Sequence, residues 1–257
     1  DPFTKLSLEK SISNIKSRNI FRTVERVVKN GSTNDLKIID INVEEKPTGE
    51  IGAGAGVGTN GGTFAVNIQE NNWLGEGKNV GLDFEINRDS VKGQFSFLDP
   101  NYDLLGNALR YNITNESNDK PDQGYENSVL STGVSTSFEQ YKNIIASLGL
   151  SVSYDDLQTT NTASAALKKQ SGEFSELALN YSFAYDQRNR SFMPTDGSIT
   201  TFSQVLPLYA DMPYLLNNFY SSTYHKFSED IIGAGKFFIS TINGLDDKDV
   251  RVSKRRF

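Results

Sequence analysis

Residues 177–186, LALNYSFAYD, alternate large apolar side chains with small or polar ones without a break. Successive side chains of a β-strand point to opposite faces, so this period of two predicts a strand with one apolar and one polar face. The same pattern recurs at residues 80–87, VGLDFEIN, and at residues 148–154, LGLSVSY. The segments around these runs are about 9–12 residues long, which is the length that a tilted strand needs to cross a bilayer.

From residue 49 onward the period is two almost throughout. The expected strands, about 11 in all, are 49–59, 62–72, 78–88, 90–98, 104–115, 128–138, 143–155, 173–186, 197–206, 217–227 and 232–243. The alternation is less regular in 128–138, 197–206 and 217–227, so the registers of these three stay open. The pattern predicts a mostly β protein, an incomplete antiparallel up-and-down transmembrane β-barrel.

The composition fits a barrel better than a helical membrane protein. Hydrophobic residues make up 37% of the 257 residues, and no stretch approaches the roughly 18 uncharged apolar residues of a spanning helix. A barrel strand shows only one face to lipid, so its average hydropathy is modest. The net charge of −6 gives no indication of a nucleic-acid partner. Because cysteine is absent, disulfides and thiolate metal sites are excluded.

The connections between the expected strands fall into two kinds. One kind is mostly short and carries an aromatic residue at or beside the turn, while the other is longer, at 116–127, 156–172 and 207–216. Outer-membrane barrels have short periplasmic turns, long external loops and aromatic girdles at both interfaces. We therefore expect the aromatic turns at the periplasmic end, together with the first 46 residues. The turn aromatics are Trp73, Tyr102, Tyr141, Phe192 and Phe227.

The first 46 residues differ from the rest of the chain. Leu8, Ile12 and Ile15 share one face of an expected helix. Two strands, at 21–29 and 36–45, follow it as a hairpin. One helix and one hairpin are too small to be a complete domain, so we expect this segment to be part of a larger module.

Glycine occupies every second position of the first expected barrel strand. Glycine weakens a strand and permits close backbone approach. Two interpretations stay open: the glycine face lies under a plug or loop, or the strand is built to pair weakly and open. One face carries Gly52, Gly54, Gly56 and Gly58, and the other carries Ile51, Ala53, Ala55 and Val57.

Few residues that carry catalysis or bind metals are present. His225 is the only histidine, so the sequence offers too few suitable side chains for a metal site and only one histidine for a Ser–His pair. The run GVGTNG at 56–61 has the spacing of a dinucleotide fingerprint, but an alternating strand follows it instead of the required helix. We therefore expect no catalytic residue, metal or cofactor, and no enzyme. The basic run at 254–256 is expected to be a solvated strand end or a contact with lipid head groups.

Four short motifs stand out along the chain: KPTGE at 46–50, QENNWLGEG at 69–77, DPNY at 99–102 and FMPTDGS at 192–198. In content and in order they resemble motifs of the BamA family of outer-membrane barrel-assembly proteins. In that family the first motif joins the last POTRA domain to the barrel, and the later ones lie at turns. The resemblance covers essentially the whole chain.

The resemblance implies a barrel of roughly 16 strands that inserts other barrel proteins into the outer membrane. Residues 1–46 would end a periplasmic POTRA domain, and residues 47–257 would begin the barrel. The family's first and last strands meet at a lateral gate, where a client strand adds to the free edge, as unpaired edges favour. The implied partners are outer-membrane lipids, unfolded β-barrel clients and accessory lipoproteins. The implied gate edge is Glu50, Ile51, Gly52, Ala53, Gly54, Ala55, Gly56, Val57 and Gly58.

Other classes of protein remain open. A translocation-and-assembly module or a two-partner secretion exporter belongs to the same superfamily and would differ in the number of POTRA domains upstream. A passive porin would begin at a strand, without the helix and hairpin. An outer-membrane phospholipase would need a Ser–His pair, and His225 has no evident partner. The Arg-Gly-Phe motif of the family's sixth external loop is absent from the chain, which ends at Phe257.

Overall fold

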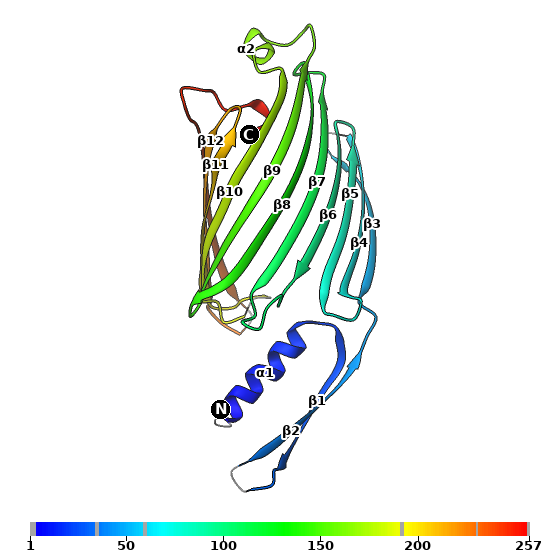
Figure 1. Ribbon diagram of the computed structural model, residues 1–257, viewed down its shortest axis with the longest axis vertical. Helices are drawn as coiled ribbons and strands as arrows, with labels where there is room; N and C mark the ends of the chain where they lie inside the picture. Colours follow the sequence, from blue (N-terminus) through cyan, green and yellow to red (C-terminus); the bar gives the residue numbers. More distant parts are fainter. Residues whose placement is uncertain (1–3, 34–35, 59–60, 191–192, 230, 256–257) are drawn as a thin grey trace.

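The computed structural model describes residues 4–33, 36–58, 61–190, 193–229 and 231–255. Phe192, one of the expected turn aromatics, lies outside the described residues. The remainder forms a large curved sheet and a small module attached to its first strand (Figure 1).

The large sheet has eleven antiparallel strands, paired in the order of the sequence. They are β3 (Gly49–Gly58), β4 (Gly61–Trp73), β5 (Lys78–Asn87), β6 (Ser90–Asp99), β7 (Ala108–Lys120), β8 (Tyr125–Tyr141), β9 (Ile144–Thr159), β10 (Gly172–Asp186), β11 (Gly197–Ala210), β12 (Tyr214–Lys226) and β13 (Ile232–Gly244). Strands β3 and β13 are its two edges, so the sheet is open. The up-and-down arrangement, the number of strands and the two edges expected from the sequence are confirmed.

The module before the sheet consists of α1 (Lys5–Ser17), β1 (Phe21–Asn30) and β2 (Lys37–Glu45). Leu8 and Ile12 on α1 are buried together with Ile20, while β1 and β2 form a separate two-stranded sheet. The backbone N–H of Lys46 donates to the carbonyl of Ile20 at 3.1 Å, which closes the module before β3 begins. No helix among the described residues is both long and apolar enough to cross a membrane.

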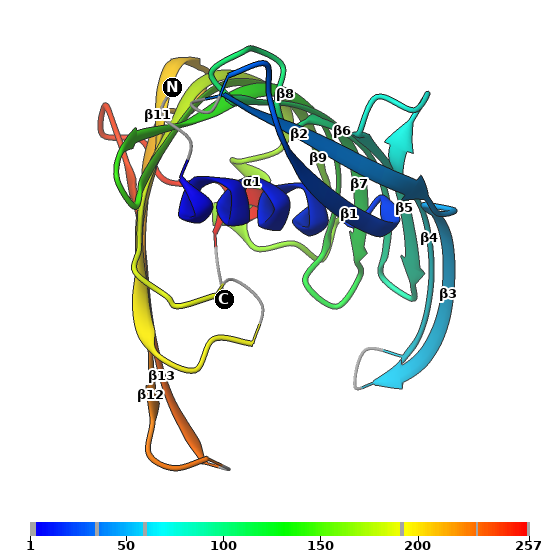
Figure 2. The same cartoon turned by 90° about the horizontal axis from the view of Figure 1, so that it is seen from below.

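The register places apolar and polar side chains on opposite faces of the sheet. In β9 and β10, Ser151 lies opposite Ala178 and Leu150 lies opposite Leu179. On the polar face, Asn180 Nδ2 donates to Ser151 Oγ at 2.8 Å. The sheet curves so that the polar face is concave and encloses the last described residues (Figure 2). Exposed apolar side chains on the convex face include Phe64, Leu82, Phe84, Leu150 and Phe183.

The turns alternate between the two ends of the sheet. Because β3 follows the small module, the turns after β4, β6, β8, β10 and β12 lie at the end where the module is attached (Figure 1). Trp73, Tyr102 and Tyr141 therefore lie at that end, as expected, and all three are exposed. In the turn between β6 and β7, the Asp103 carboxylate accepts the backbone N–H of Asn107 at 3.0 Å. Backbone hydrogen bonds, that of Asn107 first, hold the pKa of Asp103 below its usual value.

The prediction of long loops is wrong for two of the three connections, 116–127 and 207–216. Strands β7 and β8 stay paired as far as Lys120 and Tyr125, so only 121–124 connects them, and 211–213 connects β11 to β12. The polar residues of 116–127 continue the hydrogen-bonded ladder instead of ending it. In the third connection the strands extend to Thr159, and a short helix, α2 (Ala165–Lys168), follows.

The convex face changes character over β11–β13. Gln204 and Asn217 lie opposite each other on this face, and the Gln204 amide donates to Asn217 Oδ1. Tyr181 OH donates to Gln204 Oε1 at 2.5 Å, and Asn217 Nδ2 donates to Thr241 Oγ1 at 3.4 Å. The concave face carries apolar residues here, such as Leu216. Polar and apolar residues therefore occur on both faces here, since Asn218 also bonds to Ser203 on the concave face, and the alternation of these strands is irregular in the sequence.

Candidate functional site

Strand β3 offers a free backbone edge. It pairs with β4 along its whole length, from Gly49 opposite Glu70 to Gly58 opposite Gly61. No other strand among the described residues lies along its second side. Ile51 and Val57 are 79% and 92% exposed. An edge of this kind presents unpaired N–H and C=O groups on which another strand can form.

Hydrogen bonds at the start of β3 hold it to β4. The Thr48 hydroxyl donates to Glu70 Oε1, and Asn71 Nδ2 donates to the carbonyl of Thr48 at 3.3 Å. The same Glu70 oxygen accepts the backbone N–H of Asn72 at 2.7 Å. The motifs at 46–50 and 69–77 therefore meet in one junction, which fixes the beginning of the edge strand.

The glycines of β3 do not share one structural cause. A Cβ atom at Gly52 would collide with the Asn67 side chain, which lies across it. A Cβ atom at Gly54, Gly56 or Gly58 would meet no described atom within 4 Å. The interpretation in which a plug or loop covers the glycine face therefore has no support from the described residues.

Valine substitutions at Gly52 and Gly54 are expected to differ in their effect on stability. At Gly52 the new side chain must push the exposed Asn67 side chain aside, so the free energy of unfolding should fall by up to about 1 kcal/mol. At Gly54 it enters open space and favours the strand, so the free energy of unfolding should stay the same or rise slightly. Urea titration of the refolded full-length protein measures both. Equal losses at the two positions would contradict this geometry.

A hollow lies beside the edge strand. Its volume is about 560 Å³, and its lining includes Gly52, Gly54, Asn67, Asp83 and Glu85. The glycines leave the hollow open toward the free edge. The side chains of a strand added to β3 would therefore find space on this side.

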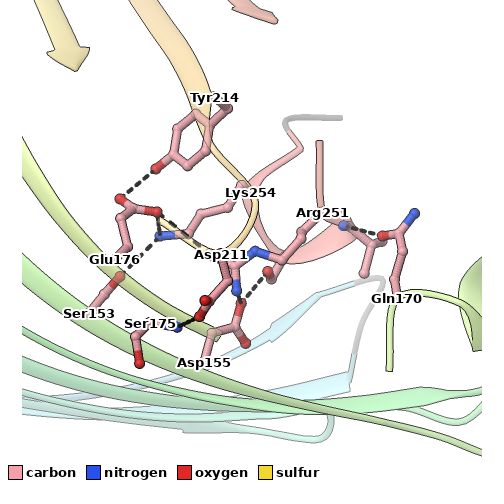
Figure 3. A network of polar contacts seen from close by, with 11 residues as sticks. Ser153, Asp155, Gln170, Ser175, Glu176, Asp211, Tyr214, Arg251 and Lys254 are labelled. Carbon is pink, nitrogen blue, oxygen red and sulfur yellow. Dashed lines mark hydrogen bonds and ion pairs between the residues drawn. The ribbon is translucent and has the colours of Figure 1, made fainter. Parts of the chain in front are cut away.

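A cluster of buried charges lies on the concave wall, close to the end of the sheet far from the small module. Asp155 on β9 and Glu176 on β10 are 0% and 6% exposed, and Arg251 beyond β13 is 2% exposed (Figure 3). Arg251 Nη1 lies 3.0 Å from Asp155 Oδ2, and its Nη2 lies 3.7 Å from Glu176 Oε2. Lys254 Nζ lies 3.4 Å from the same Glu176 oxygen.

Aromatic rings and an amide complete this cluster. The Arg251 guanidinium lies over the Phe174 ring, 4.7 Å from its centroid. Tyr214 OH donates to Glu176 Oε1 at 3.0 Å, and Gln170 Oε1 accepts the backbone N–H of Val252 at 3.0 Å. Alternation along the strands places the two carboxylates on the inner face, but it gives no sign of their cationic partners.

Within the basic run at 254–256, Lys254 is not placed as expected. Lys254 faces the buried Glu176 on the concave wall instead of solvent or lipid head groups. Arg255 donates from Nε to the carbonyl of Val250 at 2.8 Å, and residue 256 lies outside the described residues. For Lys254 the expectation was wrong, because a run of charge in the sequence does not reveal that the chain turns back into the sheet, whereas Arg255 is exposed.

The described residues give few groups for catalysis. His225 Nδ1 lies 3.6 Å from Asp196 Oδ1, and both side chains are largely exposed. No group of three or more histidine, cysteine or carboxylate side chains is gathered for a metal ion among the described residues.

Comparison with known proteins identifies the family to which this chain belongs. A family model described as the Omp85 superfamily domain matches residues 72–257, which is most of the chain. This chain belongs to the Omp85 superfamily. It is 22% identical over 204 residues to the sorting and assembly machinery component 50 homolog of Bos taurus and 21% identical over 201 residues to that of Homo sapiens. Each alignment covers 77% of this chain and 43% of the relative.

Two solved structures agree with the sheet. BamA from Haemophilus ducreyi lacking POTRA domains 1–3 superposes with a TM-score of 0.76 at 23% identity, over 96% of this chain and 51% of that chain. CdiB from Acinetobacter baumannii superposes with a TM-score of 0.56 at 9% identity, over 97% of this chain and 49% of that chain. The eleven-stranded sheet thus has the fold of a BamA barrel, and the chain spans about half the length of these proteins.

Proposed function

We propose that this chain is part of the core component of an outer-membrane β-barrel assembly machinery. It inserts other barrel proteins into the outer membrane through a lateral gate at β3. The observation that carries the proposal is the free, glycine-rich edge of β3, which pairs on one side only among the described residues. Membership of the Omp85 superfamily supports it.

The driving force follows from the cost of unpaired backbone groups in hydrocarbon. Each such group costs several kcal/mol, because no water reaches it. A client strand that adds to Glu50–Gly58 satisfies these groups, so insertion needs neither nucleotide nor cofactor. The open glycine face and the neighbouring hollow leave room for the client's inward side chains.

The remaining parts take roles that fit this activity. The module at 1–46 is the end of a POTRA domain and lies in the periplasm, next to the aromatic turns. The convex face contacts outer-membrane lipids, with Trp73, Tyr102 and Tyr141 in the interfacial girdle. Unfolded barrel proteins are the clients, accessory lipoproteins complete the complex, and the chain is not an enzyme.

Disulfide trapping tests the gate directly, because the chain has no cysteine of its own. A single cysteine at Ala53 or Ala55 of the full-length protein is expected to form a mixed disulfide with a cysteine in the last strand of a client during insertion. The matched control is a cysteine at Val134 on β8, which has strands on both sides. The adduct is detected on non-reducing gels. Normal insertion without an adduct at any position from 50 to 58 would refute the gate.

A further inference from the structure

A row of polar side chains crosses the convex face, which the proposed barrel turns toward lipid. Its members lie opposite one another on neighbouring strands from β10 to β13, and they are Tyr181, Gln204, Asn217 and Thr241. Hydrogen bonds join each member to the next, from the Tyr181 hydroxyl through the two amides to Thr241 Oγ1. We name these four residues the polar row.

The polar row lies between two rows of mainly apolar residues on the same face. The row nearer the small module consists of exposed large apolar side chains, Phe183, Phe202, Phe219 and Ile239. The row on the other side carries Leu179, Leu206 and Leu215 and ends at Asn243. Because the lipid-facing band of a barrel is apolar, these neighbours place the polar row at the depth of the hydrocarbon.

Both amides of the polar row keep unused hydrogen-bonding capacity. A carboxamide offers two N–H donors and an oxygen with two lone pairs. Within the described part of the chain, Gln204 and Asn217 each donate one side-chain hydrogen bond and accept one. Lipid tails supply no partner for the rest, and polar groups without partners are unfavourable in hydrocarbon. Hydrogen bonds between polar side chains hold neighbouring membrane segments together. The polar row therefore favours contact with another membrane-spanning protein.

We propose that the polar row is the surface through which two copies of this protein associate side by side in the membrane. A two-fold axis along the membrane normal keeps every residue at its depth, so the two rows cross at the axis and their central amides meet. A carboxamide both donates and accepts, so Gln204 and Asn217 complement the same two residues of the second copy. A second copy thus matches the polar row in chemistry and in depth.

This contact is separate from the lateral gate. Strands β11 and β12 lie toward the edge of the sheet formed by β13, whereas the gate is the opposite edge, β3 (Figure 2). Association through the polar row therefore leaves the β3 edge of each copy free for a client strand.

Cysteine cross-linking tests the contact, because the chain has no cysteine of its own. Phe219→Cys in the full-length protein places a thiol beside Asn217 on the convex face. In liposomes, oxidation is expected to give a disulfide-linked dimer on non-reducing gels. Phe84→Cys is the matched control, because Phe84 is an exposed phenylalanine of the same face on β5. This control should remain monomeric.

Replacing the two amides tests the chemistry of the contact. Gln204→Leu combined with Asn217→Leu is expected to weaken association roughly tenfold, measured by energy transfer between labelled copies in liposomes. Asn115→Leu makes the same change at an exposed amide on the convex face of β7 and should leave association unchanged. Heat-modifiable migration on gels checks that each variant is folded.

Three results would overturn the proposal. One is a wild-type protein that stays monomeric in liposomes, without a cross-link at residue 219. Another is association of equal strength in the wild type and in the folded double-leucine variant, which would show that the polar row does not hold the copies together. The third is cross-linking of residue 219 in cells to a different membrane protein, with no dimer of this chain.

Discussion

A disulfide between β3 and the strand that closes the barrel is expected to abolish insertion of new barrels while the protein itself stays folded. One cysteine replaces Ala53, and the other replaces its neighbour on the closing strand of the full-length protein. The cross-link removes the free edge, so a client strand has no template on which to pair. Reduction should restore activity. Insertion of a labelled client into liposomes that contain the locked protein measures the effect.

The control lock joins strands that are already paired. Val134 and Leu150 lie opposite each other on β8 and β9, so a disulfide between them leaves the β3 edge free. This variant should insert clients normally, whether oxidised or reduced. Undiminished insertion with the β3 lock fully oxidised would exclude the gate mechanism and leave the barrel fold untouched.

Regular alternation predicted the fold correctly where one face is apolar and the other polar. In β9 and β10, each residue pair sits on the face that the period of two assigns. The rule is weak over β11–β13, because Gln204 and Asn217 bond to each other on the convex face while Leu216 lies on the concave one. It also failed at 116–127, where polar residues form paired strand instead of loop. A strand that leaves the membrane no longer needs an apolar face.

The two candidate sites differ in how far the sequence reveals them. The edge strand can be recognised in the sequence by the glycine repeat from Gly52 to Gly58, because the residues of one strand are consecutive in the chain. The buried charge cluster of Asp155, Glu176 and Arg251 cannot, because Arg251 and Asp155 are 96 positions apart and meet only when the chain turns back into the sheet. The local pattern shows that Asp155 faces inward and gives no information about what it meets.

Replacing Arg251 with methionine is expected to lower the free energy of unfolding by about 3–5 kcal/mol, because the buried Asp155 then loses its cation while Lys254 stays with Glu176. Arg88→Met, at an exposed ion pair, should cost no more than about 1 kcal/mol and serves as the control. Urea titration of the full-length protein in detergent micelles measures each change.

The double variant Arg251→Met with Asp155→Leu decides whether the two charges act as a pair. It leaves Glu176 with Lys254, so no buried carboxylate stands without a cation. Its loss should be smaller than the sum of the two single losses by about 0.5–3 kcal/mol, the coupling typical of residues in one charged network. Additive losses would show that Arg251 and Asp155 stabilise the wall independently. The ion pair would then hold the segment around Arg251 no more tightly than its packing against Phe174 does.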